Sequence, residues 1–61
     1  MYYDKLMEMI TELGIQQVSI LLNRSQSTIY RWKNKITAPT QLEQSSILRV
    51  YDEIFRIAKN I

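Results

Sequence analysis

Apolar residues recur at helical spacing in the first part of the chain. Residues 3–13 carry them at positions i, i+3, i+4 and i+7, the pattern of one buried stripe along a helix: Leu6, Met9, Ile10 and Leu13. Asp4 suits either the N-cap position or the first turn, where an acid complements the positive end of the helix dipole. Gly14 suits the left-handed position that ends many helices. We therefore predict a first helix over residues 3–13.

A second, shorter amphipathic pattern covers residues 16–22, whose inward positions are Val18, Leu21 and Leu22. Ile15 is expected to pack at the entry to this helix, and Ile20 lies on its outer side. Asn23 follows at once, and Asn is the residue other than Gly that best tolerates a left-handed conformation. The pattern predicts a second helix that ends in a tight turn.

The third pattern begins after Ser25, a residue type that caps helix N-termini well. From residue 26 to residue 34 or 35, Ile29 and Trp32 are three positions apart, and Ile36 lies one turn further on. This spacing predicts that one side is buried and that Trp32 belongs to the core. The opposite side of the predicted helix is polar and shows Gln26, Ser27, Tyr30, Arg31 and Lys33.

A fourth pattern follows the loop of residues 36–39 and begins with a capping box, in which Thr40 precedes Glu43 by three positions. Apolar residues then spread over about half the helical circumference of residues 41–59. The sequence leaves open one continuous helix or a break near Ser45 and Ser46. Because this face is wider than a short bundle needs, we predict a homodimer interface formed by Ile47, Val50, Tyr51, Ile54, Ile57, Ala58 and Ile61.

The 61 residues form one domain, which at this length buries only about 60% of the surface that its unfolded chain exposes. One Gly and one Pro in the whole chain argue against a turn-rich β fold. We predict an all-α fold class: a compact four-helix bundle, or a five-helix bundle if residues 41–59 break, containing a helix-turn-helix.

The chain contains neither Cys nor His. This excludes disulfides and thiolate or imidazole metal sites, and it removes the commonest catalytic bases. We expect no enzyme activity, no metal, no cofactor and no small-molecule ligand. No apolar stretch approaches the roughly 20 residues that span a bilayer, and the first residues do not resemble a signal peptide. We therefore expect a cytoplasmic protein that does not bind membranes.

Positive charge is concentrated in one window. Residues 24–40 carry four basic residues and no acid, whereas residues 1–23 sum to −2 and residues 41–61 to zero. Such a patch on a nearly neutral chain is typical of a protein that binds the phosphate backbone of a nucleic acid. Arg24, Lys33 and Lys35 lie at the two ends of the third predicted helix, where phosphates would flank a groove.

Two short helices separated by residues 23–25 have the form of a helix-turn-helix, which places its second helix in the major groove of DNA. The polar side of the third predicted helix has suitable chemistry: Gln bonds adenine, Arg bonds guanine and Ser bonds either. Tyr30 would contact the backbone through its hydroxyl or a thymine methyl through its ring. We predict four base-reading residues, Gln26, Ser27, Tyr30 and Arg31; a salt bridge to an acid of the first helix is the alternative for Arg31.

Residues 16–35, QQVSILLNRSQSTIYRWKNK, resemble the helix-turn-helix of lambda-repressor-like regulators. The segment SQSTIYRWKN is similar to the recurring recognition helix of that family, S-Q-S-T-I-S-R-W-E-N. The resemblance implies a sequence-specific transcriptional regulator of phage or mobile-element type that binds an inverted repeat as a dimer. It also implies backbone contacts from Gln16, Gln17, Ser25, Thr28 and Asn34.

The chain departs from this family at several positions. Ile15 stands where a backbone-contacting polar residue is usual, Ser19 replaces a small Ala, and Asn23 replaces a turn Gly. Arg24 replaces an apolar turn residue. The long segment 41–59 resembles the phage CII-type activators instead, so the resemblance leaves repressor and activator open.

Two other functions fit the same sequence. One is a small adaptor or inhibitor that uses the helix-turn-helix fold to dock on another protein, for which Ile20 and the wide apolar stripe of residues 47–61 are the best support. The other is an accessory DNA-binding protein of recombination or packaging. Salt-dependent binding to duplex DNA separates the adaptor from the two DNA-binding functions.

Overall fold

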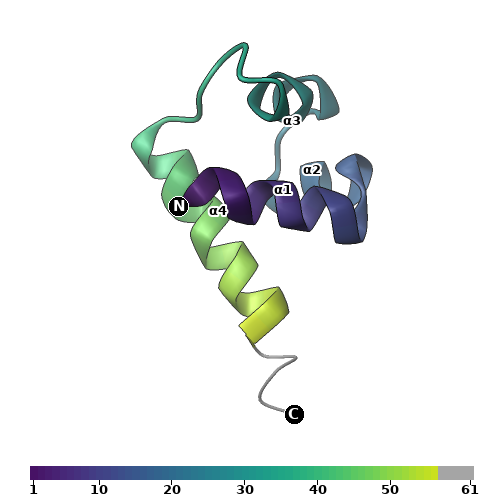
Figure 1. The fold of residues 1–61 in the computed structure, drawn as a ribbon, viewed down its shortest axis with the longest axis vertical. Helices are drawn as coiled ribbons and strands as arrows, with labels where there is room; N and C mark the ends of the chain where they lie inside the picture. The colour runs from purple at the N-terminus through teal and green to yellow at the C-terminus, as the bar shows by residue number, and fades with distance from the viewer. Residues whose placement is uncertain (57–61) are drawn as a thin grey trace.

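The computed structural model describes residues 1–56, and every secondary-structure element in that range is helical (Figure 1). Its helices are α1 (Tyr2–Leu13), α2 (Ile15–Leu22), α3 (Gln26–Lys33) and α4 (Gln41–Tyr51). α4 continues into a π-helical turn, η1 (Asp52–Arg56). The predicted all-α fold class is therefore confirmed. Within residues 1–56, no helix has the length and apolar character needed to cross a bilayer.

The core takes two apolar side chains from each of the four α-helices, at spacings of three or four residues. In each helix this spacing places both side chains on one stripe, which faces the other helices. The eight residues are Leu6, Met9, Val18, Leu22, Ile29, Trp32, Ile47 and Val50. Trp32 is only 4% exposed, so the predicted core position of this indole is confirmed.

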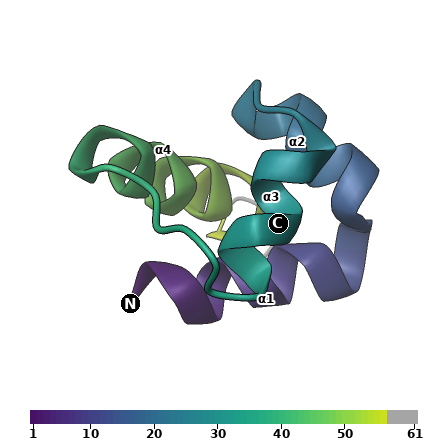
Figure 2. The same cartoon turned by 90° about the horizontal axis from the view of Figure 1, so that it is seen from above.

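The helices place α3 and the C-terminal part of α4 at opposite ends of the molecule (Figure 1). α1 packs across α4, and α2 contacts α1, α3 and α4. Figure 2 looks onto the α3 end, where α3 lies nearest the viewer above α1. The rest of the bundle packs against one side of α3, and the opposite side is open to solvent.

Two of the helix boundaries follow from residues that accept positive φ angles. Asn23 has φ 56° and ψ 47°, so the predicted left-handed turn after α2 is confirmed. Gly14 has φ 89° and ψ 154°, an extended conformation with positive φ that is open essentially to Gly alone. The predicted left-handed cap at Gly14 is therefore wrong in ψ, although its N–H still bonds the Ile10 carbonyl and ends α1.

Two apolar residues expected in the core are exposed instead. Leu21 is 38% exposed because Val18 and Leu22, one turn apart, take the inward positions of α2. Ile36 is 66% exposed because α3 ends at Lys33 and the chain then turns through Lys35 at φ 61°. The helical stripe of α3 thus ends before Ile36.

The predicted dimer interface must be redrawn. Ile47 and Val50 are buried in the core of the chain itself, so they are not available to a second subunit. Tyr51 and Ile54 are half-buried and pack against the edge of that core. The other three predicted interface residues lie outside the described range: Ile57, Ala58 and Ile61.

The helix predicted over residues 41–59 begins where expected. Thr40 and Glu43 form the predicted capping box, in which each side chain accepts a hydrogen bond from the other residue's backbone N–H. The helix runs through Ser45 and Ser46 without a break and changes to π-helical geometry only at Asp52. Residues 57–59 lie outside the described range.

Candidate nucleic-acid interface

α3 has one buried side and one exposed polar side. Ile29 is fully buried and Trp32 nearly so, which fixes the helix against the bundle. The opposite side carries the four predicted base-reading residues, all exposed: Gln26, Ser27, Tyr30 and Arg31. Their side chains form no hydrogen bond or ion pair with any residue from 1 to 55. This side is therefore free to bond to a partner.

The N-terminus of α3 is capped as predicted. The Ser25 hydroxyl accepts a hydrogen bond of 3.2 Å from the Thr28 backbone N–H and lies 2.9 Å from the Thr28 hydroxyl. Ser25 has extended backbone geometry, as N-cap residues do. The cap satisfies one of the free N–H groups of the first turn and leaves the others to solvent or an anion.

The C-terminal end of α3 is held by Tyr3, a residue that the sequence did not indicate. Its hydroxyl donates a hydrogen bond of 2.6 Å to the Lys33 carbonyl. The Lys35 ammonium lies 4.6 Å from the centre of the Tyr3 ring, a cation–π contact. The Asn34 side chain donates to the Tyr30 carbonyl at 3.0 Å. Tyr3 thus positions the basic end of α3 from α1.

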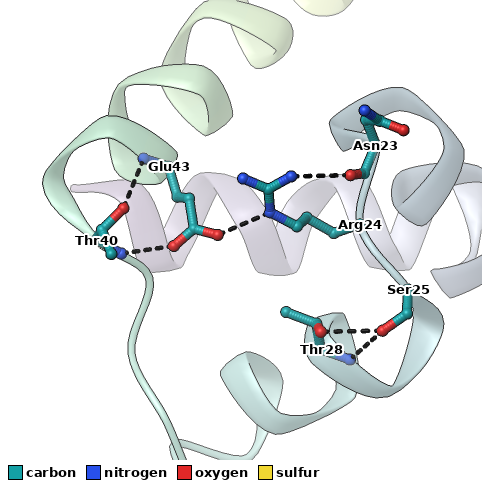
Figure 3. A network of polar contacts seen from close by, with 6 residues as sticks. All are labelled: Asn23, Arg24, Ser25, Thr28, Thr40 and Glu43. Atoms are coloured by element: carbon teal, nitrogen blue, oxygen red, sulfur yellow. Dashed lines mark hydrogen bonds and ion pairs between the residues drawn. The ribbon is translucent and has the colours of Figure 1, made fainter.

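The turn between α2 and α3 is tied to α4 by an ion pair (Figure 3). Arg24 Nε donates to Glu43 Oε2 at 2.7 Å, and Arg24 Nη1 donates to the Asn23 carbonyl at 3.0 Å. The Thr40 backbone N–H, and secondly the Arg24 guanidinium, hold the pKa of the Glu43 carboxyl below its ordinary value. The predicted phosphate contact of Arg24 stays a prediction; in the structure its charge is paired within the chain, with 43% of its side chain exposed.

The other basic residues of the window are not paired. Arg31, Lys33 and Lys35 form no ion pair with residues 1–56. The alternative expected for Arg31, a bridge to an acid of the first helix, is therefore absent from the described part of the chain. Among the acids, Glu8 of α1 accepts a hydrogen bond from Tyr51 at the end of α4, and Glu53 of η1 pairs with Arg49 of α4. The surface around α3 thus keeps its surplus positive charge.

A shallow depression of about 300 Å³ lies between the start of α2 and the outer side of α3. Its lining consists of the four predicted base-reading residues and Ile15: Gln26, Ser27, Tyr30, Arg31 and Ile15. Ile15 is the first residue of α2 and packs partly against the core. The structure therefore brings the four predicted residues together around one concavity and adds an apolar residue to them.

The first turn of α2 carries the other predicted backbone contacts. Gln16 and Gln17 are exposed there. Ser19, which stands where the resembled family has Ala, is 6% exposed, and its hydroxyl donates to the Gln16 carbonyl at 2.6 Å. The buried hydroxyl is satisfied locally, so Ser is accommodated at this position.

No family model, curated protein or solved structure matches the chain. The geometry of α2 and α3 and the chemistry of their exposed residues therefore carry the functional argument.

Proposed function

We propose that this chain is a sequence-specific double-stranded DNA-binding regulator whose α2 and α3 act as a helix-turn-helix. One observation carries the proposal: α3 is anchored by Ile29 and Trp32 and presents Gln26, Ser27, Tyr30 and Arg31 outward with no side-chain bonding partner among residues 1–55. The major groove accepts one α-helix with polar side chains on its outer side. The resemblance of residues 16–35 to lambda-repressor-like regulators supports a transcriptional regulator of phage or mobile-element type.

The exposed groups of α3 match the base edges of the major groove. The Gln26 amide can bond adenine N6 and N7, and the Arg31 guanidinium can bond guanine O6 and N7. Each such bidentate pair discriminates against a wrong base by about 1–3 kcal/mol. Ser27 and Tyr30 add hydroxyl groups on the same side.

Phosphate contacts provide affinity and register rather than sequence preference. Lys33 and Lys35 supply charge at the C-terminal end of α3, and the free N–H groups beside Ser25 can bond a phosphate oxygen at the other end. Gln16 and Gln17 extend this surface along α2. Arg24 can join these contacts only by exchanging Glu43 for a phosphate, because the two side chains are paired.

Specific binding also requires two half-sites, since one helix covers only a few base pairs. In a dimer, two recognition helices lie about 34 Å apart on one face of the duplex. The C-terminal part of α4 projects from the end opposite α3 (Figure 1). A parallel pairing of this segment around a two-fold axis would leave both α3 helices on the same side, with Tyr51, Ile54 and Phe55 as its half-buried apolar residues.

The test begins with selection of bound sequences from random duplexes and continues with variants on the selected site. We expect an inverted repeat, and we expect Gln26→Ala and Arg31→Ala to lose discrimination between that site and a scrambled duplex. Gln41→Ala and Arg49→Ala are matched controls, because they remove the same residue types from exposed positions of α4. Equal discrimination by all four variants, measured by mobility shift at a fixed salt concentration, would contradict the proposal.

A second candidate function is a protein-docking adaptor, which is favoured by exposed aliphatic side chains. Ile20 is 63% exposed and Leu42 is 80% exposed. Scattered single residues of this kind are normal on soluble proteins, so they carry less weight than α3. The adaptor predicts no salt-dependent affinity for duplex DNA, whereas the proposed regulator predicts affinity that falls steeply with salt.

A further inference from the structure

Ile15 occupies a position where the surrounding chemistry is polar. It lines the depression of about 300 Å³ together with the four exposed polar residues of α3. Its side chain is half-buried and packs against the core, so its place beside α3 is fixed by the bundle. An isoleucine can neither donate nor accept a hydrogen bond, so it cannot bond a phosphate or a polar base edge. The polar residues of the depression can hydrogen-bond base edges, so any contact of Ile15 with DNA must be with an apolar group.

The major groove offers one apolar group, the C5 methyl of thymine; the other features of the base edges are hydrogen-bond donors and acceptors. On the basis of the proposed function, we propose that Ile15 is a specificity-determining residue that receives a thymine methyl group in each half-site. The Tyr30 ring, 55% exposed on the neighbouring helix, forms the other apolar wall of the same depression.

The neighbouring polar groups complete the recognition of a thymine edge. Gln26 and Arg31 line the depression beside Ile15 and Tyr30, and each carries N–H donors. Thymine presents an O4 acceptor next to its methyl group, so one of these donors can bond O4 while the methyl contacts Ile15. Cytosine presents an amino donor at the same place and lacks the methyl. The lining thus favours thymine over cytosine through both the methyl group and the O4 acceptor.

Deoxyuridine substitution tests this inference, because it removes the methyl group and leaves every hydrogen-bonding group of the base in place. In the selected site, each thymine is replaced in turn, and the affinity of the wild-type protein is measured. We expect about a fourfold loss at one thymine in each half-site, the factor for one buried methyl-sized group. No loss at any thymine would overturn the inference.

Variants of the protein then assign the effect to Ile15. We expect Ile15→Ala to bind the thymine and deoxyuridine duplexes equally, and Ile15→Val to keep most of the preference. The ratio of two affinities is measured on the same protein, so a change in stability alone does not move it. Ile20→Ala is the matched control from the exposed outer side of α2 and should keep the full preference. Retention of the full preference by Ile15→Ala would overturn the assignment.

A further duplex carries a 5-methylcytosine·guanine pair at the thymine position where deoxyuridine weakens binding. This pair keeps a 5-methyl pyrimidine, so it shows whether thymine itself or any 5-methyl pyrimidine is recognised. We expect it to bind less well than thymine·adenine, because its amino group replaces the O4 acceptor. Equal or tighter binding would overturn the assignment to thymine. The proposed function fails by a different result, the absence of any selected sequence, so the two failures are distinguishable.

Discussion

α3 and α4 each place two apolar residues in the core, yet their polar side chains are used in different ways. At the start of α4, Thr40 and Glu43 bond each other's backbone, and Glu43 also binds Arg24. On the outer side of α3, the side chains of Gln26, Ser27, Tyr30 and Arg31 form no hydrogen bond or ion pair within residues 1–55. Polar groups that are bonded within the chain hold it together, whereas unpaired groups gathered on one basic helix are available to a ligand.

The largest expected effect is on stability, and it comes from comparing a buried residue of α3 with an exposed one. Trp32→Ala removes a buried indole and should destabilise the protein by about 3–5 kcal/mol. A chain of this length has a total stability of only about 3–9 kcal/mol, so much of the population should unfold. Tyr30→Ala, on the exposed side, should change stability by no more than about 0.5 kcal/mol. Urea denaturation followed by circular dichroism measures both, and similar losses would contradict the assignment of buried and exposed sides.

The two N-caps provide the next comparison. Ser25→Ala and Thr40→Ala each remove a side-chain acceptor from a first-turn N–H, so each should cost about 1 kcal/mol of stability. Only Ser25→Ala is expected to weaken DNA binding as well, because its hydroxyl lies at the phosphate-facing end of α3. Thermal melts and DNA titrations of both variants, made where both remain folded, distinguish these roles. Weaker DNA binding by Thr40→Ala but not by Ser25→Ala would contradict the proposal that α3 contacts DNA.

The Arg24–Glu43 pair predicts a dependence of stability on acid pH. The hydrogen bonds from the Thr40 backbone N–H and from the Arg24 side chain lower the pKa of the Glu43 carboxyl below its ordinary value of 4.5 in the folded protein. Its carboxylate therefore stabilises the fold above about pH 4.5, and this contribution is lost as pH falls through the lowered pKa. We expect Glu43→Gln to reduce the pH dependence of the melting temperature in this range, while Glu53→Gln serves as the control. An unchanged pH dependence in Glu43→Gln would show that the pair contributes nothing.

The smallest expected effect concerns the far end of the molecule. Tyr51 donates a hydrogen bond of 2.9 Å to Glu8, and this bond raises the pKa of the Tyr51 phenol above 10. The neutral phenol favours the folded state, so its contribution is present below about pH 10 and is lost as pH rises through the raised pKa. Absorbance titration should show the raised pKa of the Tyr51 phenol in the wild type and a lower pKa for this phenol in Glu8→Gln. DNA binding at neutral pH should not change.

The features that the sequence predicted are mostly local ones. The Ser25 cap, the Thr40 capping box and the left-handed Asn23 each depend on residues within three or four positions, so their chemistry is visible in the sequence. Ile29 and Trp32 are likewise fixed by helical spacing. The exposure of the polar residues of α3 follows from the same periodicity. Their binding to DNA remains a prediction.

The features that the sequence missed join distant segments. Arg24 meets Glu43 across 19 positions, and the Tyr3 hydroxyl meets the Lys33 carbonyl across 30. Periodicity shows that α4 has an apolar side but not whether α1 or a second subunit covers it, so the sequence alone predicts Ile47 in an interface. Ile15 was expected to pack at the entry to α2, but its place beside α3 depends on how the two helices pack.

The central claim is that the outer side of α3 contacts base edges. It is tested most directly by backbone amide chemical shifts of ¹⁵N-labelled protein, titrated with the selected duplex and with a scrambled duplex of the same composition. We predict that the shifts specific to the selected duplex are largest at residues 26–31, with smaller changes at the start of α2. Shifts that centre on α4, or that are the same for both duplexes, would contradict the account.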